Sequence, residues 1–581
     1  MMRGLLKDKH FITLVILIIF TAITVIVAQV LRETPLPQTS VSLYNNDTYE
    51  SDTGIVDSSA GGGWTGIEET LIPDMLAVVA HQARVDELLL FELNSGYYSL
   101  DTPFVVIDPY GKSPLSALAL FTSTEPMKIS VHVPGRTAAA DVDFTFEGYN
   151  ITHKIPILGL LPDMLNIVTL TGRTQGGSVS SITLELQTDP LPPELYGDII
   201  ITNIVSPENI SPGVNFTYAH KTAFDVNGDY RWFYNDFWLR GFALYDYNGH
   251  MVFAKGAYHE GDVLLIEVNM LGKILSVFYS PYGAHHDITS RDGGNLIING
   301  SRGATVEDFI YEIDARTGYV VNRLDLKNVL QRTRSEGFPR FDPIDWFHHN
   351  STVYEDGSII ISGRVQSAVA KLSWPEGELR WILADHIGWN QMFHQYLLTP
   401  IGYGFEWSYG QHAAQILPDF DNDPDTIDIL LFDNGNGRFD HNRELQRKIA
   451  NNEISAPENY SRIVHYRINE RNMTIEQIWQ FGKELGYTYF AEGWSNAVLL
   501  DNGNKLGAFD RYTAEHGGSI NANIIEVDVD GQIIWEVFGT SASTNGSLHV
   551  YRVLRLPIYK DAANDLRIGV PARVFIPDRL L

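Results

Sequence analysis

The chain has 581 residues, 44% of them hydrophobic and 12% aromatic, so it is long enough for two or three domains with sizeable cores. Its 42 basic and 71 acidic side chains give a formal charge of −29, which argues against nucleic acid and anionic membrane surfaces as partners, because both bind basic surfaces. It has no cysteine, which excludes disulfides, thiolate nucleophiles and cysteine-based zinc sites.

The N-terminus contains one apolar run of membrane length, residues 10–31, preceded by Arg3, Lys7 and Lys9. This pattern predicts a transmembrane helix with the bulk of the chain outside the cytoplasm. A cleaved signal peptide is the alternative, because residues 26–28 form an acceptable cleavage site. We therefore expect residues 1–31 to be a membrane anchor or signal peptide. The protein would be a single-pass membrane protein with an extracytoplasmic domain, or secreted or periplasmic if the N-terminus is cleaved.

Residues 32–75 are rich in Ser, Thr, Asp and Gly and predict a flexible linker. Residues 76–192 contain short apolar runs separated by Gly and Pro, which predict a small β-sandwich domain. The expected strands are residues 88–93, 104–107, 128–133, 143–146, 166–171 and 181–187. The proline-rich residues 189–193 predict the domain boundary.

Residues 193–581 show a loose repeat. Strands that end in tryptophan recur at Trp232, Trp381 and Trp535, and turns with Asp-Gly or Asn-Gly recur at residues 292–293, 356–357 and 502–503. The repeat is roughly 50–70 residues long, and repeated four-stranded units of this kind are typical of a β-propeller; counting them suggests six blades. The overall prediction is an all-β protein: a six-bladed β-propeller preceded by a small β-sandwich domain and an N-terminal transmembrane helix.

Three segments of the second domain carry histidines beside a predicted strand. They contain His285 and His286, then His348, His349, Asn350 and Arg364, and finally His412. Side chains alternate along a strand, so His348 and Asn350 should share a face that His349 does not. Arginine, histidine and asparagine donors suit a tetrahedral oxyanion, and histidine can act as nucleophile or acid–base. These residues predict an anion site for sulfuryl or phosphoryl transfer, while a divalent-ion site made by the histidines and Asp287 stays open.

An acidic loop follows the third segment, with carboxylates at Asp419, Asp421, Asp423 and Asp425. Alternate oxygen ligands are typical of calcium loops, but the glycine and distal glutamate of an EF-hand are missing. A solvated acidic turn is the favoured interpretation, and a structural Ca²⁺ is the alternative.

Longer motifs around the histidines resemble those of the bacterial periplasmic arylsulfotransferases, the PAPS-independent arylsulfate sulfotransferase family. The resemblance is carried by D-W-F-H-H-N-S (345–351), S-G-R-V-Q-S-A-V (362–369), Q-H-A-A-Q-I-L-P (411–418), L-L-F-D-N-G-N-G-R (430–438) and H-H-D-I (285–288). In the first domain, residues 122–135 and 156–170 resemble the N-terminal β-sandwich of the family.

The resemblance implies a six-bladed propeller that moves a sulfuryl group from an aryl sulfate ester to a phenol by a ping-pong route through a sulfohistidine, without PAPS or another cofactor and with no metal at the site. It implies His412 as the nucleophile, and His348, Asn350 and Arg364 as ligands of the sulfuryl oxygens. One more histidine is expected from the preceding repeat. Its spacing to Gly294-Asn295 favours His286, whereas strand alternation favours His285.

Three aromatic residues, Trp346, Phe405 and Trp407, are candidates for stacking on the aryl ring. The expected partners are a small-molecule aryl sulfate and a phenolic acceptor, with membrane contact through the N-terminal helix and a homo-oligomer left open. A cell-surface propeller that binds sulfated or other anionic ligands without turnover is the alternative function, because a fold alone does not establish an activity.

Overall fold

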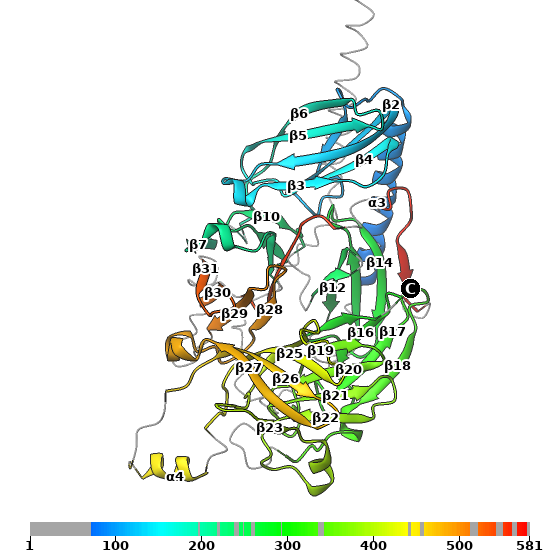
Figure 1. Ribbon diagram of the computed structural model, residues 1–581. Coiled ribbons are helices and arrows are strands. Elements are labelled where there is room, and N and C mark those ends of the chain that lie inside the picture. The colour runs from blue at the N-terminus through cyan, green and yellow to red at the C-terminus, as the bar shows by residue number, and fades with distance from the viewer. Residues whose placement is uncertain are drawn as a thin grey trace, which may run out of the picture.

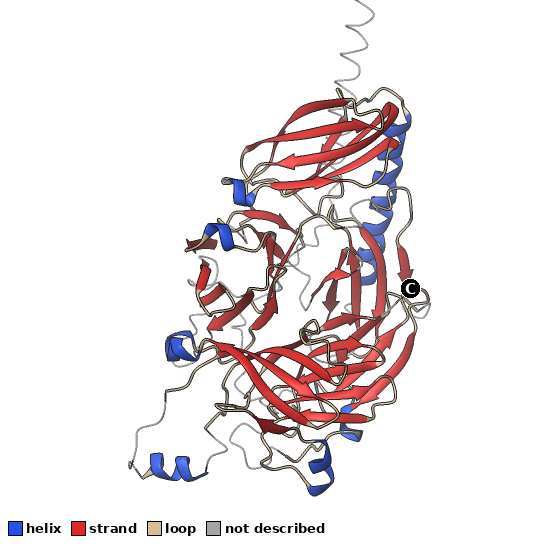
Figure 2. Cartoon of the chain, viewed as in Figure 1, coloured by secondary structure: helices blue, strands red, loops and turns tan. Residues whose placement is uncertain are grey.

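The computed structural model describes residues 71–577, with gaps at 194, 196–197, 218–220, 237–242, 248, 257–261, 292, 335–341, 440–442, 452, 454–457, 512–520, 542–549 and 561–565. Most of the regular secondary structure in the described chain is β-strand, with helices at the periphery (Figures 1 and 2). The anchor predicted at residues 10–31 and nearly all of the predicted linker lie outside the described residues and stay predictions. In the part that is described, no helix has both the length and the apolar character needed to cross a bilayer.

The described chain begins with a long helix, α3 (Leu71–Asn94), which runs alongside both parts of the molecule (Figure 1). Its buried apolar residues, Val85, Leu89 and Leu93, recur at intervals of four residues and form one face. Asp86 on this helix binds Lys273 Nζ (2.6 Å) and Tyr110 Oη (2.8 Å), which joins the helix to both domains. The strand expected at residues 88–93 is therefore wrong, because a short apolar run has no period of its own and here continues a helical stripe.

The first domain is a sheet of six strands that surrounds one long strand, β2. The first half of β2 pairs with β1 and β4, and its second half pairs with β3 and β5, after a register shift between Thr122 and Met127. Strand β2 therefore belongs to both halves of the sheet. The two halves can pack as in a sandwich although all six strands belong to one hydrogen-bonded sheet. The strands are β1 (Phe104–Ile107), β2 (Ser116–Val133), β3 (Val142–Thr145), β4 (Asn150–Leu158), β5 (Leu165–Thr174) and β6 (Val179–Gln187). Five of the six expected strands are confirmed.

Six further sheets follow within the described residues, each with four or five strands. Their members, in chain order within each sheet, are β8 (Val214–Thr217), β9 (Thr222–Phe224), β10 (Tyr230–Phe233) and β32 (Val553–Leu556); β11 (Ala243–Tyr247), β12 (His250–Gly256), β13 (Val263–Val268), β14 (Ile274–Ser280) and β33 (Arg573–Phe575); β15 (Ile288–Ser290), β16 (Leu296–Gly300), β17 (Phe309–Ile313) and β18 (Val320–Asp325); β19 (His349–Glu355), β20 (Ser358–Gly363), β21 (Ala368–Ser373) and β22 (Leu379–Leu383); β23 (Thr399–Ile401), β24 (His412–Ile416), β25 (Thr426–Asp433), β26 (Arg462–Asn469) and β27 (Thr474–Phe481); and β7 (Asp198–Ile204), β28 (Asn496–Leu499), β29 (Lys505–Arg511), β30 (Asn521–Val527) and β31 (Ile533–Ser541). A short helix, α4 (Arg443–Ala450), projects between β25 and β26.

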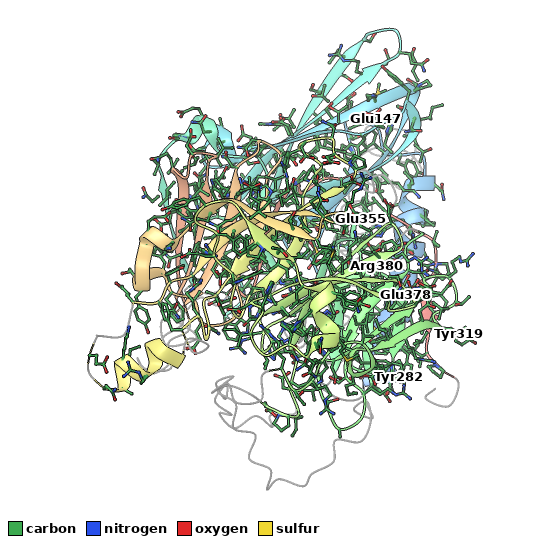
Figure 3. The ribbon with its side chains drawn as sticks, turned by 60° about the horizontal axis from the view of Figure 1, so that its bottom comes forward. Glu147, Tyr282, Tyr319, Glu355, Glu378 and Arg380 are labelled. Atoms are coloured by element: carbon green, nitrogen blue, oxygen red, sulfur yellow. The ribbon has the colours of Figure 1, made fainter. Side chains whose placement is uncertain are left out.

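The six sheets are linked at both ends of the domain. Strand β7 opens the domain and pairs with β31 in the last sheet, while β32 returns to pair with β8 in the first. Strand β15 contacts β19, β19 contacts β24, and β24 contacts β28, so an edge strand of each of these sheets contacts an edge strand of the next. The opposite edges point outward: Tyr319, Glu378 and Arg380 lie at the periphery in Figure 3 and are exposed. This arrangement is consistent with a propeller.

The repeated tryptophans and glycine turns have the structural roles expected of them. Trp232, Trp381 and Trp535 are almost fully buried between sheets. Gly357 and Gly503 adopt positive φ at hairpin turns, where a glycine has no steric penalty.

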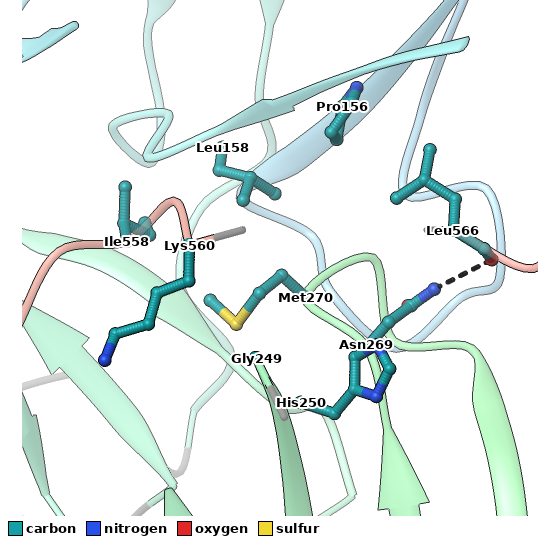
Figure 4. A pocket seen from close by; sticks show the side chains of 9 residues that line it. All are labelled: Pro156, Leu158, Gly249, His250, Asn269, Met270, Ile558, Lys560 and Leu566. Atoms are coloured by element: carbon teal, nitrogen blue, oxygen red, sulfur yellow. Dashed lines mark hydrogen bonds between the residues drawn. The ribbon is translucent and has the colours of Figure 1, made fainter. Parts of the chain in front are cut away.

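The C-terminal segment joins the two domains. It passes the first domain, where Tyr559 Oη donates to Pro156 O (3.0 Å), and then adds β33 in parallel to β14. A cavity of about 20 Å³ lies at this junction between Leu158, Met270 and Leu566 (Figure 4). It has room for about one water molecule and is lined by none of the predicted site residues.

Candidate active site

Two predicted site residues, His286 and His348, share a local backbone feature with three residues at equivalent places in other sheets. His286, His348, Ala413, Trp494 and Tyr551 all have positive φ, between 54° and 57°, and each lies next to the first residues of an inward-facing strand. Such a conformation is uncommon for residues other than glycine and concentrates at functional sites. It turns the chain just before each strand, so strict alternation of side chains does not apply at His286 or His348.

His286 and His348 meet at a shared carboxylate. Their rings lie 4.8 Å apart, and Glu307 Oε2 is 3.0 Å from both His286 Nε2 and His348 Nδ1. Asp345 Oδ2 also contacts His348 Nδ1, at 2.5 Å, and Tyr551 Oη contacts His286 Nδ1 at 2.7 Å. Carboxylates accept hydrogen bonds, so each imidazole carries a proton on the nitrogen that faces Glu307. One buried acid therefore orients two histidines that lie 62 positions apart in chain numbering (286 and 348).

His412 is the first residue of β24 and is 1% exposed. Burial lowers the pKa of its imidazole well below the ordinary value, and the positive charge of Arg364 lowers it further. A hydrogen bond from His412 Nδ1 to Asn434 Oδ1 (2.8 Å) acts in the opposite direction and does not cancel these effects. His412 is therefore neutral near pH 7, which is the form that can act as a nucleophile.

Arg364 and Asn350 come from the segment that forms the sheet of β19–β22, and they connect this sheet to His412. Arg364 follows β20, and its backbone N–H donates to His348 O (3.1 Å), so the arginine and His348 are held by one backbone hydrogen bond. Asn350 Nδ2 donates to Gln411 O (2.8 Å), the carbonyl directly before His412. The structure thus brings His286, His348, Asn350, Arg364 and His412 together from three consecutive sheets.

A second layer of buried polar groups lies beside these residues. His349 Nε2 bonds to Ser351 O (2.9 Å), and burial lowers the pKa of its imidazole to about 3. His285 Nε2 bonds to Gly300 O (3.0 Å) in its own sheet, and its ring lies 5.4 Å from that of His286. It is His286, rather than His285, whose ring contacts His348.

Asp287 forms part of a link between sheets. Its Oδ1 is 3.0 Å from Arg552 Nη1, and Arg552 also donates to Asn350 O. Burial raises the pKa of Asp287, while the Arg552 charge acts against that rise. Asp287 is therefore committed to an ion pair rather than turned toward the histidines.

The three candidate aromatic residues pack in apolar surroundings, and their stacking on an aryl ring stays a prediction. Trp346 is 0% exposed in an apolar core, and its Nε1 donates to Asp308 Oδ2 (2.7 Å). Phe405 and Trp407 pack against each other at 4.7 Å beside another core cluster. Their packing accounts for all three residues without a ligand.

Two overlapping groups have the geometry that a metal ion accepts. They are His285, His286 and Glu307, and Glu307, Asp345 and His348, each with ligand atoms within 4.8 Å of one another. In the acidic loop, the carboxylates of Asp419 and Asp421 accept backbone N–H bonds from Asp421 and Asp423, and Asp421 pairs with Arg467. These bonds are those of a self-capped turn, and calcium binding there stays a prediction.

Four residues of the site were not among the sequence candidates. Asp345 and Asn434 lie inside the quoted motifs, and their position beside His348 and before a glycine turn was the available signal. Glu307 and Tyr551 come from segments with no motif, so only their contacts in space identify them.

The site can be compared with known proteins. The sequence profile of the family described as "Arylsulfotransferase (ASST)" matches residues 209–552, and that of the "Arylsulfotransferase Ig-like domain" matches residues 104–189. The chain therefore belongs to the arylsulfotransferase family, and it is a sulfotransferase enzyme.

Individual relatives have the same assignment. The chain is 25% identical over 513 residues to "Arylsulfate sulfotransferase AssT" of Lelliottia amnigena and 24% identical over 511 residues to the protein of that name from Escherichia coli O6:H1. Each alignment covers 67% of this chain and 81% of the relative. A solved structure, a putative 6-phosphogluconolactonase from Bacteroides fragilis, is 10% identical with a TM-score of 0.32, covering 75% of this chain and 99% of that one. The assignment of the chain to the arylsulfotransferase family therefore rests on the family profiles and the sequence relatives, and not on this structure.

Proposed function

We propose that this enzyme transfers a sulfuryl group from an aryl sulfate ester to a phenol by a ping-pong route, with the six sheets as the blades of a propeller and a sulfohistidine at His412 as the intermediate. The observation that carries the proposal is the buried, neutral His412, whose Nδ1 is bound to Asn434 Oδ1 and whose pKa is lowered more by the Arg364 guanidinium than by any other charge. This combination supplies a nucleophile beside a fixed cation.

In the first half-reaction, the Nε2 lone pair of His412 attacks the sulfur of the donor. The bond between sulfur and the aryl oxygen breaks, and its electron pair leaves with the phenolate. Arg364 neutralises negative charge on the sulfuryl oxygens as the sulfur is transferred. His348, as an imidazolium oriented by Glu307, supplies the one proton that the phenolate takes and becomes a neutral imidazole, while His286 positions Glu307 and the ring of His348.

In the second half-reaction, the neutral His348 accepts the proton of the incoming phenol and returns to the imidazolium, while the phenol oxygen attacks the sulfur on His412. Asn350 supports both steps because it fixes the carbonyl of Gln411 next to the nucleophile. Each step uses side chains of this chain alone, so the proposal includes no cofactor. The donor and acceptor enter and leave the same site in turn.

The test is labelling with an aryl [³⁵S]sulfate in the absence of acceptor. Wild-type protein should retain label and release it on addition of phenol, with and without a chelator. His412→Asn should fold but retain no label, whereas His394→Asn, which alters an exposed histidine outside the site, should behave as wild type. Equal labelling of the His412→Asn protein would contradict the assignment. Binding of the aryl sulfate without release of phenol would instead favour a non-catalytic binding propeller.

A further inference from the structure

Asn434 is held more firmly than its position in a loop would suggest. It follows β25 and is 0% exposed. Its Nδ2 donates to Ala491 O (2.9 Å) and Trp494 O (3.0 Å), both in the segment that leads into the next sheet. Because carbonyl oxygens only accept, these two bonds fix which way the amide points. The oxygen Oδ1 is therefore the atom that faces His412.

The backbone of Asn434 is anchored as well. Ser461 Oγ donates to Asn434 O at 2.7 Å. The preceding residue, Asp433, is bound by Arg462 Nε (2.8 Å) and Arg438 Nη2 (2.9 Å). With its side chain and main chain both held, Asn434 cannot move away from His412 without breaking several buried hydrogen bonds.

This geometry determines the protonation of His412. Its Nδ1 lies 2.8 Å from Asn434 Oδ1 and 3.1 Å from Gly410 O. Both are acceptors, so Nδ1 carries the hydrogen and the lone pair is on Nε2. The tautomer that can attack sulfur is the one that this packing selects.

We propose that Asn434 is a positioning residue whose neutral amide keeps the sulfohistidine reactive. This inference rests on the proposed function. Attack by Nε2 on the donor forms the N–S bond, breaks the S–O bond and leaves the ring as an N-sulfoimidazolium with its hydrogen still on Nδ1. An amide oxygen accepts a hydrogen bond from Nδ1 but is too weak a base to take the proton.

Retention of that proton decides how well His412 leaves in the second half-reaction. When phenol attacks, the N–S electron pair returns to Nε2, and neutral imidazole departs if Nδ1 is protonated. If a carboxylate removed the Nδ1 proton, the leaving group would be an imidazolide anion, a far stronger base and therefore a poorer leaving group. An aspartate at position 434 would thus favour loading of the enzyme and slow its discharge.

The experiment measures the two half-reactions separately, with 4-nitrophenyl sulfate to load the enzyme and phenol to discharge it. In Asn434→Asp, we expect sulfo-enzyme to form at least as fast as in wild type and its discharge to slow at least tenfold. In Asn434→Ala, where Gly410 O is the remaining acceptor described for Nδ1, loading should slow at least tenfold and discharge should not. The two substitutions therefore affect opposite half-reactions, which loss of structure would not do.

Asn436→Asp is the matched control. Asn436 lies in the same loop, is 6% exposed, and its described hydrogen bond goes to Glu492 O rather than to His412, so the substitution adds the same charge at a different position of the loop. Its discharge rate should stay within twofold of wild type. An unchanged discharge rate in Asn434→Asp would overturn the inference and leave the proposed function intact. If the wild type forms no sulfo-enzyme, the proposed function itself fails.

Discussion

Glu307→Gln tests the shared carboxylate. Glu307 has a side chain that is 1% exposed, and its Oε2 accepts from two imidazoles at 3.0 Å each. A hydrogen bond to a charged group contributes about 1.5–3 kcal/mol, so removal of the charge should lower the free energy of unfolding by about 3–5 kcal/mol. Glutamine keeps the shape of the side chain, but it lacks the negative charge with which Glu307 accepts hydrogen bonds from both histidines. Transfer to phenol should fall by about 10²–10⁴-fold, the usual contribution of a positioned acid–base.

The assay combines urea unfolding with single-turnover transfer at pH 7. Glu312→Gln is the matched control, because Glu312 is equally buried, lies five positions later (312 against 307) on β17, and accepts from Asn295 and Asn322. It should lower stability while both half-reactions stay within about twofold of wild type. Transfer by Glu307→Gln that matches the Glu312→Gln rate would refute the role assigned to the shared carboxylate.

Two further predictions concern pH. Because burial and Arg364 lower the pKa of His412 well below 6.5, the rate of loading should stay constant from pH 8 to 6, whereas an ordinary histidine would be only about one-quarter neutral at pH 6. In Arg364→Met, loading should be slower at every pH, but it should stay constant from pH 8 to 6, because burial, the larger cause of the lowered pKa, remains; a decline toward pH 6 in the variant would contradict this. The second prediction is that His349 makes the fold sensitive to acid, because its pKa falls from 6.5 unfolded to about 3 folded. Its contribution is complete above pH 6.5 and is lost toward pH 3 at about 1.4 kcal/mol per pH unit, so His349→Gln should show a shallower decline in unfolding free energy between pH 6 and 4, and parallel curves would exclude it.

Many residues of the candidate site could be predicted from the sequence. The motifs around His286, His348 and His412 were long enough to indicate the family, and the spacing to the Gly294-Asn295 turn favoured His286. Local rules also sufficed for the turns at Gly357 and Gly503, because Asp-Gly and Asn-Gly determine such turns within four residues.

Other features depended on contacts between distant segments. The apolar run at residues 88–93 predicts a strand but forms part of helix α3, because a short apolar run is ambiguous until it packs on both domains. Alternation along a strand did not apply to the histidines, because positive φ at His286 and His348 re-aims both rings.

The sequence alone therefore determined an all-β chain, its repeats, its family resemblance and the residue types of the anion site. The tertiary structure decided which groups hold those residues: Glu307 for His286 and His348, and Asn434 for His412. The physical reason is that the residues proposed as nucleophile, acid–base and cation come from motifs that can be recognised locally. Their orientation and protonation depend on acceptors from other segments, and burial makes those acceptors decisive.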